Sequence, residues 1–386
     1  MAAKTKKRAN LSRMKDYNHA VVRKSGIDVG FLTVVILLAV FGLIMVFSAS
    51  YPSANYRYGD GLYFFRKQGI WVLLGFVGML FTIKYDYRKY KKNAFVIAIV
   101  TLAFLGLVLL SPAINGARRW LGFGGFSFQP SEMAKISVII YFAAALSVAK
   151  DKIRDYKCLL KFFGMLGVVL VLLFLEPHFS VCIIIGSVVA IMLLVAGAKG
   201  KHFLYTALPL VPVGVALMIK ESYRLDRLKV YLDPFIDPKG DGWQIIQSLY
   251  AIGSGGLFGL GFGNSRQKYM YVSEPQNDFI FSIICEELGI IGAVLVIVLF
   301  AILIWRGLKI AINAPDTFGT LLVTGIISLV AVQTFLNIAV VTKLIPTTGI
   351  PLPFFSAGGS SLVFLMMSMG MVLNVSTYKT QVVDLQ

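Results

Sequence analysis

The chain has 386 residues, of which 57% are hydrophobic and only 15% are charged, with a formal net charge of +18. A soluble protein of this length could not bury so much apolar side chain, because part of any globule faces water. The charges cluster between long apolar runs, which indicates membrane-spanning helices oriented by basic loops, and no basic stretch is interleaved with aromatics as a nucleic-acid partner would require.

Each helical span needs roughly 20 mostly apolar residues, and the apolar runs predict about ten of them. The first follows a basic tail that is too long for a signal peptide, so we expect it to be retained. The fold class is therefore an all-α polytopic membrane protein with a large extracytoplasmic loop between helices 7 and 8. The predicted spans are residues 29–50, 69–83, 93–112, 132–149, 161–176, 180–197, 203–220, 279–305, 317–342 and 361–376.

Lysine and arginine are more frequent in the segments on the same side as the N-terminus, which predicts that both termini are cytoplasmic. We expect a basic tail over 1–26, one membrane domain over 27–376 and a second tail over 377–386. The long loop, about 221–277, is too short for its own core. Its Trp243–Leu249 stretch is typical of a short helix on the membrane surface.

Polar residues at membrane depth are costly and are therefore candidate functional residues. Arg118 and Arg119 precede a span that begins near Glu132 and Lys135, which are three residues apart and share a helix face. Two arginines and a lysine could bind a pyrophosphate. Alternatively, Glu132 and Lys135 form a helix-end ion pair and the arginines lie at lipid headgroups.

The turn Glu176-Pro177-His178 separates two apolar runs. It is either part of a functional site or a simple break between two helices. The chain has three cysteines and three histidines, and their spacing indicates neither a disulfide framework nor a metal site.

Asp278 lies where the long loop enters a span. A carboxylate there could cap the helix N-terminus. It could also act as a general base, since partial burial would raise its pKa toward the working range. Glu286 and Glu287 follow two turns deeper, and we expect one of them to face the interior of the bundle.

Prolines and glycines over Pro346–Phe354 and Ser356–Ser361 forbid a regular helix. An irregular segment beside the membrane must pack against protein or line a cavity, so it is either a lid or a re-entrant turn. No phosphate-binding loop of the Gly-Lys-Ser/Thr type is present, so the sequence shows no nucleotide energy source.

Together these segments resemble the SEDS family (shape, elongation, division and sporulation). The amino-acid sequence of Pro346–Phe354 is FtsW/SpoVE-like rather than RodA-like. The resemblance covers most of the chain, in family order. The matching stretches are Asn115–Trp120, Phe128–Lys135, Gly259–Ser265, Pro275–Phe281, Glu286–Gly289 and Pro346–Ser361.

The resemblance implies a peptidoglycan glycosyltransferase that polymerises lipid II, the undecaprenyl-pyrophosphate-linked precursor, in the bacterial cell membrane during septal or sporulation wall synthesis. It implies a class B penicillin-binding protein as transpeptidase partner, together with other division proteins. The resemblance implies an enzyme that needs no nucleotide. It assigns no metal ligands and leaves open whether the enzyme needs a divalent cation. The key family aspartate falls on Asp278, and the substrate-binding positions on Arg118, Arg119, Glu132, Lys135, Glu176 and Ser360.

The chain departs from the family pattern at two places, because His178 replaces a carboxylate and Ala357 replaces a common tyrosine. The chemistry we expect is an inverting transfer with Asp278 as the general base. The alternatives are a lipid II flippase, which an inverted repeat would favour, and a non-catalytic scaffold. A carboxylate and cations on one outer surface favour the enzyme.

Overall fold

The computed structural model describes residues 20–24, 26–112, 118–123, 126–203, 205, 229–240 and 242–382. Within these residues eight helices are long and apolar enough to cross a membrane, and a shorter apolar helix, α7, covers Phe179–Val195. The eight are α2 Val29–Tyr58, α3 Tyr63–Lys84, α4 Tyr87–Val108, α5 Pro130–Ala149, α6 Tyr156–Leu175, α11 Ile280–Ile312, α12 Thr317–Val341 and α13 Gly359–Ser376.

The all-α polytopic fold is confirmed, and the predicted spans correspond to these helices with one exception. The predicted seventh span, 203–220, lies outside the described residues apart from positions 203 and 205. The helices α2 and α11 are longer than predicted, ending at Tyr58 and Ile312. Polar residues in the last turns of α2 had suggested an earlier end, but a helix can continue beyond the apolar stretch.

Aspartates set the start of four helices at one end of the bundle. Asp28 accepts a hydrogen bond from the backbone N–H of Phe31 (2.8 Å), and Asp316 accepts one from that of Gly319 (2.7 Å). Asp86 and Asp155 cap α4 and α6 in a similar way. Each carboxylate satisfies a backbone N–H that the first helical turn leaves without a partner, which fixes where the chain enters the membrane.

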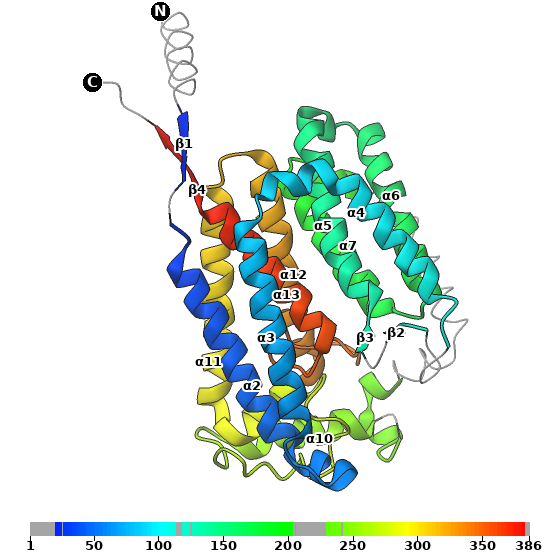
Figure 1. The fold of residues 1–386 in the computed structure, drawn as a ribbon. Helices are drawn as coiled ribbons and strands as arrows, with labels where there is room; N and C mark the ends of the chain where they lie inside the picture. Colours follow the sequence, from blue (N-terminus) through cyan, green and yellow to red (C-terminus); the bar gives the residue numbers. More distant parts are fainter. Residues whose placement is uncertain are drawn as a thin grey trace, which may run out of the picture.

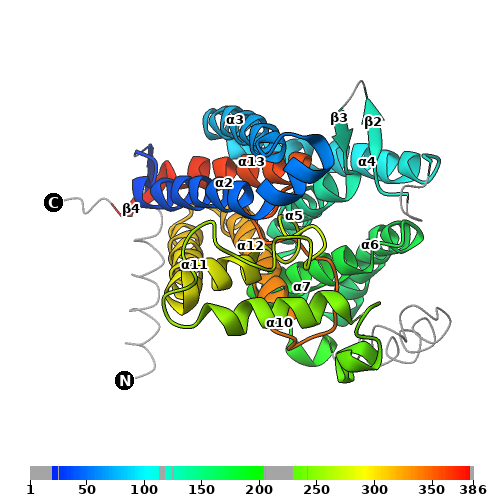
Figure 2. The ribbon, with the colours of Figure 1, turned by 90° about the horizontal axis from the view of Figure 1, so that it is seen from below.

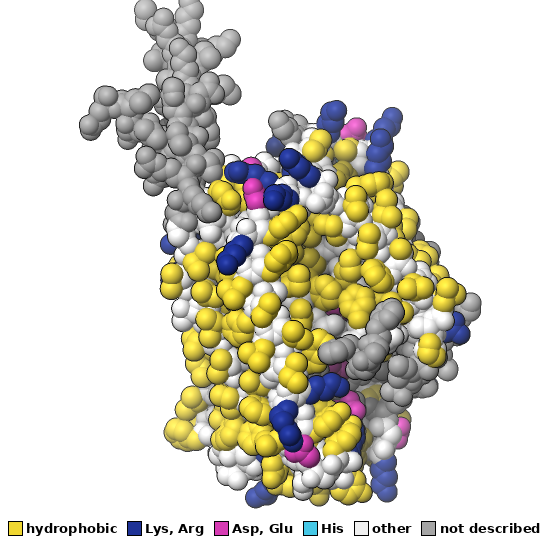
Figure 3. Space-filling model, viewed as in Figure 1, with side chains coloured by type: hydrophobic (Ala, Val, Ile, Leu, Met, Phe, Trp, Pro, Cys, Tyr) yellow, Lys and Arg dark blue, Asp and Glu magenta, His cyan; other side chains and the backbone are white. Residues whose placement is uncertain are grey.

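The helices α5, α12 and α13 lie at the centre of the bundle, and α3, α4 and α6 lie at its periphery (Figure 1). Two thirds or more of the most apolar part of each central helix is buried, against 22% for each peripheral one. The peripheral helices therefore present apolar side chains to lipid, visible as the broad hydrophobic surface in Figure 3. Polar side chains on the central helices face protein instead.

The two ends of the described chain meet at one end of the bundle. Strand β1 (Ala20–Lys24) pairs antiparallel with β4 (Tyr378–Val382), so both tails leave on the same side (Figure 1). Lysine and arginine side chains gather at this end in Figure 3. This arrangement agrees with the prediction that the two termini share one side of the membrane.

The opposite end carries a short hairpin and a helix that lies across the bundle. Strands β2 (Leu121–Phe123) and β3 (Phe126–Phe128) form the hairpin, which the sequence did not predict. The predicted surface helix at Trp243–Leu249 is the start of α10, Trp243–Gly255, seen along its length in Figure 2. It packs against α11 and α12 and so covers the end of the central helices.

The helix α11 is interrupted at Gly289, whose backbone is left-handed in φ (65°) with ψ of −163°. The loop after α10 crosses this break: the backbone N–H of Leu260 donates to Glu286 O (2.9 Å), and that of Gly261 to Glu287 O (3.0 Å). A Cβ at Gly259 or Gly289 would collide with the other backbone. The crossing loop thus pairs carbonyls beside the break, as a membrane-embedded break requires.

Candidate active site

A cavity of about 210 Å³ lies at the end of the bundle opposite the termini. It brings together four of the predicted site residues, Arg119, Glu132, Lys135 and Asp278, although they are far apart in the sequence. Further polar side chains complete its lining, and His178 among them belongs to the turn noted in the sequence. They include Gln129, His178, Gln333, Ser356 and Ser361.

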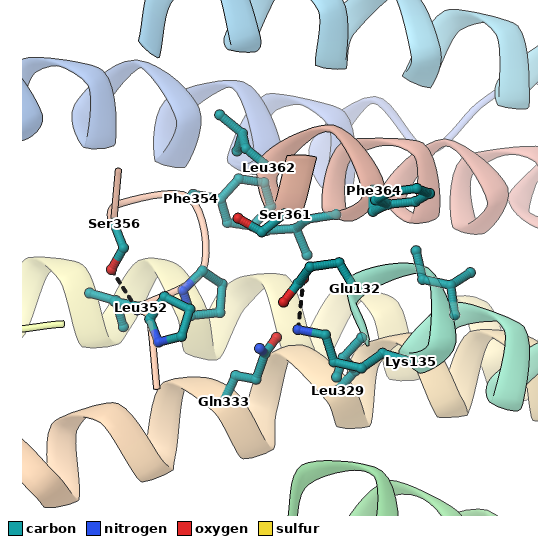
Figure 4. A pocket seen from close by; sticks show the side chains of 14 residues that line it. Glu132, Lys135, Leu329, Gln333, Leu352, Phe354, Ser356, Ser361, Leu362 and Phe364 are labelled. Carbon is teal, nitrogen blue, oxygen red and sulfur yellow. Dashed lines mark hydrogen bonds and ion pairs between the residues drawn. The ribbon is translucent and has the colours of Figure 1, made fainter. Parts of the chain in front are cut away.

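Glu132 and Lys135 form a buried ion pair at the start of α5, with Lys135 Nζ 2.8 Å from Glu132 Oε2. Their side chains are 9% and 4% exposed. Figure 4 shows the pair directed toward Gln333 of α12 and Ser361 of α13, next to a smaller cavity of about 40 Å³. The ion-pair alternative is therefore correct in part, but the pair is inside the cavity rather than at an exposed helix end, where a pair contributes little.

Asp278 is half buried and lies in the turn before α11. The helix α11 begins at Ile280 and its N-cap position is Phe279, so Asp278 lies one residue before the cap position. Gly349, with φ of +63°, lies over the carboxylate, and a Cβ there would be 3.2 Å from Asp278 Oδ2. A larger residue would be strained and would crowd the carboxylate.

The irregular segment 346–358, which precedes α13, is bound to the turn that carries Asp278. Asn337 of α12 donates from Nδ2 to the backbone oxygens of Asp278 (2.8 Å) and Ile350 (2.7 Å). Ser356 Oγ donates to Asn277 O at 2.8 Å. These contacts hold both segments against α12, so the irregular segment packs against protein and lines the cavity, as the sequence predicted for a segment at this depth.

The structure separates the two arginines. The Arg119 guanidinium donates from Nε to Glu176 O (3.3 Å) and from Nη2 to Pro177 O, which places it in the cavity lining. Arg118 is exposed, and its Nη1 donates to Leu109 O (2.8 Å) outside the cavity. Of these two adjacent residues, only Arg119 therefore reaches the cavity.

Ser360 and Glu176 are buried next to the cavity but do not line it. Ser360 Oγ accepts the backbone N–H of Gln129 at 3.4 Å and so joins the start of α13 to that of α5. The Glu176 carboxylate is fully buried, and neither of its oxygens has a hydrogen-bond partner among the described residues. Both residues stay predictions as substrate ligands.

Burial sets the ionisation of the turn between α6 and α7. It raises the pKa of Glu176 to about 8, although the positive charge of Arg119 draws that pKa down. Burial, with Arg119 and Lys135, lowers the pKa of His178 to about 3. His178 is therefore a neutral imidazole at neutral pH, with Nε2 3.0 Å from Gln129 Nε2. The turn adds no negative charge that would offset Arg119 and Lys135.

We expect the Glu176→Gln variant to flatten the dependence of stability on pH. Between pH 4.5 and about 8 the folded protein keeps a proton on Glu176 that the unfolded chain has lost, so stability falls as pH rises through this window. Glutamine cannot ionise and removes that fall. Thermal unfolding of both proteins across the window measures it, and parallel curves would contradict the assignment of a buried protonated carboxyl.

A second buried cluster fixes the loop before Asp278. Lys268 Nζ lies 2.8 Å from Glu287 Oε1 and donates to Gly263 O (2.6 Å) and Ser48 Oγ (3.3 Å). Glu286 accepts the backbone N–H of Arg266 at 2.9 Å. Both glutamates are fully buried, so the interior position expected for one of them is taken by both. The loop supplies enough donors to satisfy two carboxylates.

Polar residues inside spans gave a signal that the sequence analysis did not use. Gln333 and Asn337 are one helical turn apart on α12, and the structure directs one into the cavity and the other to the backbone of Asp278. The predicted motif residues Asn115–Ala117 lie outside the described residues. Among the described residues no group of three or more His, Cys, Asp or Glu side chains could hold a metal ion.

Known proteins match this chain over nearly its whole length. A family model described as the cell cycle protein family FtsW/RodA/SpoVE matches residues 29–381. Stage V sporulation protein E of Bacillus subtilis is 42% identical, over 92% of this chain and 98% of that protein. A probable peptidoglycan glycosyltransferase FtsW of Trichlorobacter lovleyi is 42% identical, over 90% and 93%.

Solved structures show the same fold. A chain from a peptidoglycan synthase complex, described as coordinating polymerization and crosslinking, superposes with a TM-score of 0.75 at 28% identity, covering 91% of this chain and 97% of that chain. The rod shape determining protein RodA of Thermus thermophilus superposes with a TM-score of 0.66 at 25% identity, covering 91% and 96%.

Proposed function

Because this chain belongs to the SEDS family, with FtsW and SpoVE proteins among its similar relatives, we propose that it is a peptidoglycan glycosyltransferase. Its substrate is lipid II, which it polymerises into glycan strands by inverting transfer. The observation that carries the proposal is one cavity in which the Asp278 carboxylate and the cations Arg119 and Lys135 line the same space. Such a transfer requires a general base and a positively charged binding site for the anionic leaving group.

In the proposed reaction Asp278 takes the proton from the 4-hydroxyl of the acceptor sugar. The acceptor oxygen forms a bond to the anomeric carbon of the donor, and the bond from that carbon to the pyrophosphate breaks. The electron pair of the broken bond leaves on undecaprenyl pyrophosphate, so no general acid is needed. Attack opposite to the leaving group converts an α-linked donor into a β-linked chain with one base.

Arg119 and Lys135 stabilise the negative charge that develops on the pyrophosphate. Glu132 holds Lys135 in place at 2.8 Å, and carbonyls of the Glu176 turn hold Arg119. Fixed charges in a site shielded from water cost little reorganisation during the reaction. Arg118 and Ser360 have supporting roles in this proposal, with Arg118 at the headgroup level and Ser360 joining α13 to α5.

We place both termini in the cytoplasm and the cavity on the outer face of the cell membrane, in one membrane domain whose long loop spans about 221–277. The basic residues gathered at the end where the termini leave support this orientation. The partner in this proposal is a class B penicillin-binding protein, a transpeptidase, working with other division proteins. The similarity to a chain from a peptidoglycan synthase complex supports it.

The test is to give lipid II in detergent to the purified protein, with and without its transpeptidase partner, and to separate the products as glycan strands. Strands that require the protein are the expected result. Movement of lipid II across vesicle membranes without strands, under any partner or cation condition, would replace the polymerase with a flippase.

A further inference from the structure

A second cavity, of about 270 Å³, lies next to the first and has no part in the reaction described so far. It is lined by five parts of the chain: the end of α2, the start of α3, Trp120, the 274–277 turn and the start of α13. It is larger than the first cavity, at about 210 Å³. The transfer joins a donor sugar to an acceptor sugar. The first cavity alone would have to hold both, so the second cavity is a candidate binding site for one of them.

The two cavities share a wall. Trp120, Asn277, Ala357 and Gly358 line both of them. The wall is held in place because the backbone N–H of Ala357 donates to Gln276 O at 2.8 Å. Asp278, which follows Asn277, lines the first cavity and not the second, so the base lies on the first-cavity side of this wall. The side chain at position 357 is a single methyl group, so it fills little of the space between the two cavities.

The lining of the second cavity suits a sugar ring. Four aromatic residues line it: Tyr58, Phe64, Trp71 and Trp120. A Cβ at Gly359 would be 2.6 Å from Trp71 Cε2, so the glycine allows the indole to lie against the start of α13. One face of a pyranose is formed by C–H groups and packs on aromatic rings, while its hydroxyls and N-acetyl group need polar partners.

Gln276 supplies a polar partner that the protein itself leaves unused. Its side chain is 2% exposed and lines the second cavity, and its Oε1 has no hydrogen-bond partner among the described residues. A buried acceptor without a donor is costly. A hydroxyl or acetamide N–H of a bound sugar would satisfy it. Arg57 and Lys67, both exposed, lie in the lining. Arg57 is 3.5 Å from Glu274, which lines the same cavity, so Lys67 is the cation left for the anionic part of the same substrate.

We propose that this cavity is the acceptor subsite, which binds the N-acetylated sugar whose hydroxyl attacks. The inference rests on the proposed function. Trp71 and Trp120 pack on the sugar ring, and Gln276 accepts a hydrogen bond from it. The 4-hydroxyl is directed past Ala357, which lines both cavities, toward Asp278. The donor sugar and its pyrophosphate occupy the first cavity, beside Arg119 and Lys135, so the acceptor approaches from the side opposite to the leaving group.

The first experiment measures binding without catalysis. The probe is a lipid-free disaccharide pentapeptide labelled with a fluorophore on its peptide, and its anisotropy is followed with the full-length protein in detergent. We expect Trp71→Ala and Gln276→Ala to weaken binding by about tenfold or more, which corresponds to about 1.4 kcal/mol. Trp71→Phe, which keeps a ring, should restore most of it. Trp305→Ala, at an exposed tryptophan of α11, is the matched control.

The second experiment separates the two substrates. A labelled lipid II whose terminal 4-hydroxyl is inverted can donate but not accept, and ordinary lipid II is then varied as the acceptor. Gln276→Ala should raise the KM for the acceptor about tenfold and leave the KM for the donor within about twofold. A rise in the donor KM alone, or no change in either, would overturn the assignment.

The two experiments keep this inference apart from the proposed function. A wild-type protein that couples no sugars would contradict the polymerase, whereas the anisotropy series would still decide whether the second cavity binds sugar. Unchanged probe binding in both Trp71→Ala and Gln276→Ala would overturn the subsite even if polymerisation is observed. Thermal unfolding of each variant shows whether the fold is kept.

Discussion

Replacing Asp278 with asparagine should abolish the synthesis of glycan strands and leave the fold intact. Asparagine has nearly the same shape but cannot accept a proton, and a positioned general base contributes about 10²–10⁴-fold to a rate. Asn337 Nδ2 donates to the backbone oxygen of Asp278 at 2.8 Å, and the substitution leaves this contact in place. The measurement is strand formation from lipid II by the purified variant.

Asp60→Asn is a suitable control for this experiment. Asp60 is a carboxylate at the same end of the bundle, paired with Arg66 and outside both cavities. This variant should make strands at the wild-type rate, because an exposed pair contributes little. Strand synthesis by Asp278→Asn at a rate close to that of Asp60→Asn would remove Asp278 from the role of base.

The sequence predicted most of the fold because bilayer physics leaves few choices. A run of about 20 apolar residues has to satisfy its backbone hydrogen bonds internally, so the spans from α2 to α13 follow from hydropathy. The ends were less predictable. Helix α2 continues to Tyr58 because a helix does not stop where the apolar stretch stops, and α11 continues through the break at Gly289.

The site residues were predictable singly but their grouping was not. Arg119, Lys135 and Asp278 are distant in sequence, and only the packing of α5 and α12 against the segments at the outer end brings them to one cavity. Hydropathy also cannot tell Arg118 from Arg119, since the two are adjacent and identical and differ only in the contacts that the fold gives them. The second cavity had no sequence signal, because aromatic residues near a membrane surface are common.

Removing the charge of Lys268 should be strongly destabilising. Among the described residues, Lys268→Met leaves the buried Glu287 carboxylate with Ser48 Oγ (2.7 Å) and the backbone N–H of Ser265 (3.4 Å) as its remaining partners. Breaking a buried ion pair by removing one partner costs about 3–5 kcal/mol, because the remaining charge is uncompensated. The unfolding temperature of the purified protein should fall markedly, and activity should fall with it, since Lys268 anchors the loop that leads into Asp278.

The double variant Lys268→Met/Glu287→Gln distinguishes this explanation from a simple loss of packing. Glutamine carries no charge, yet its oxygen can still accept from Ser48 and its amide can donate to Gly263 O after Lys268 is gone. The double variant should therefore be more stable than Lys268→Met alone, with a coupling of about 0.5–3 kcal/mol between neighbouring residues. If it is less stable, the loop depends on the lysine side chain as packing, and the ion pair is not what holds it against α11.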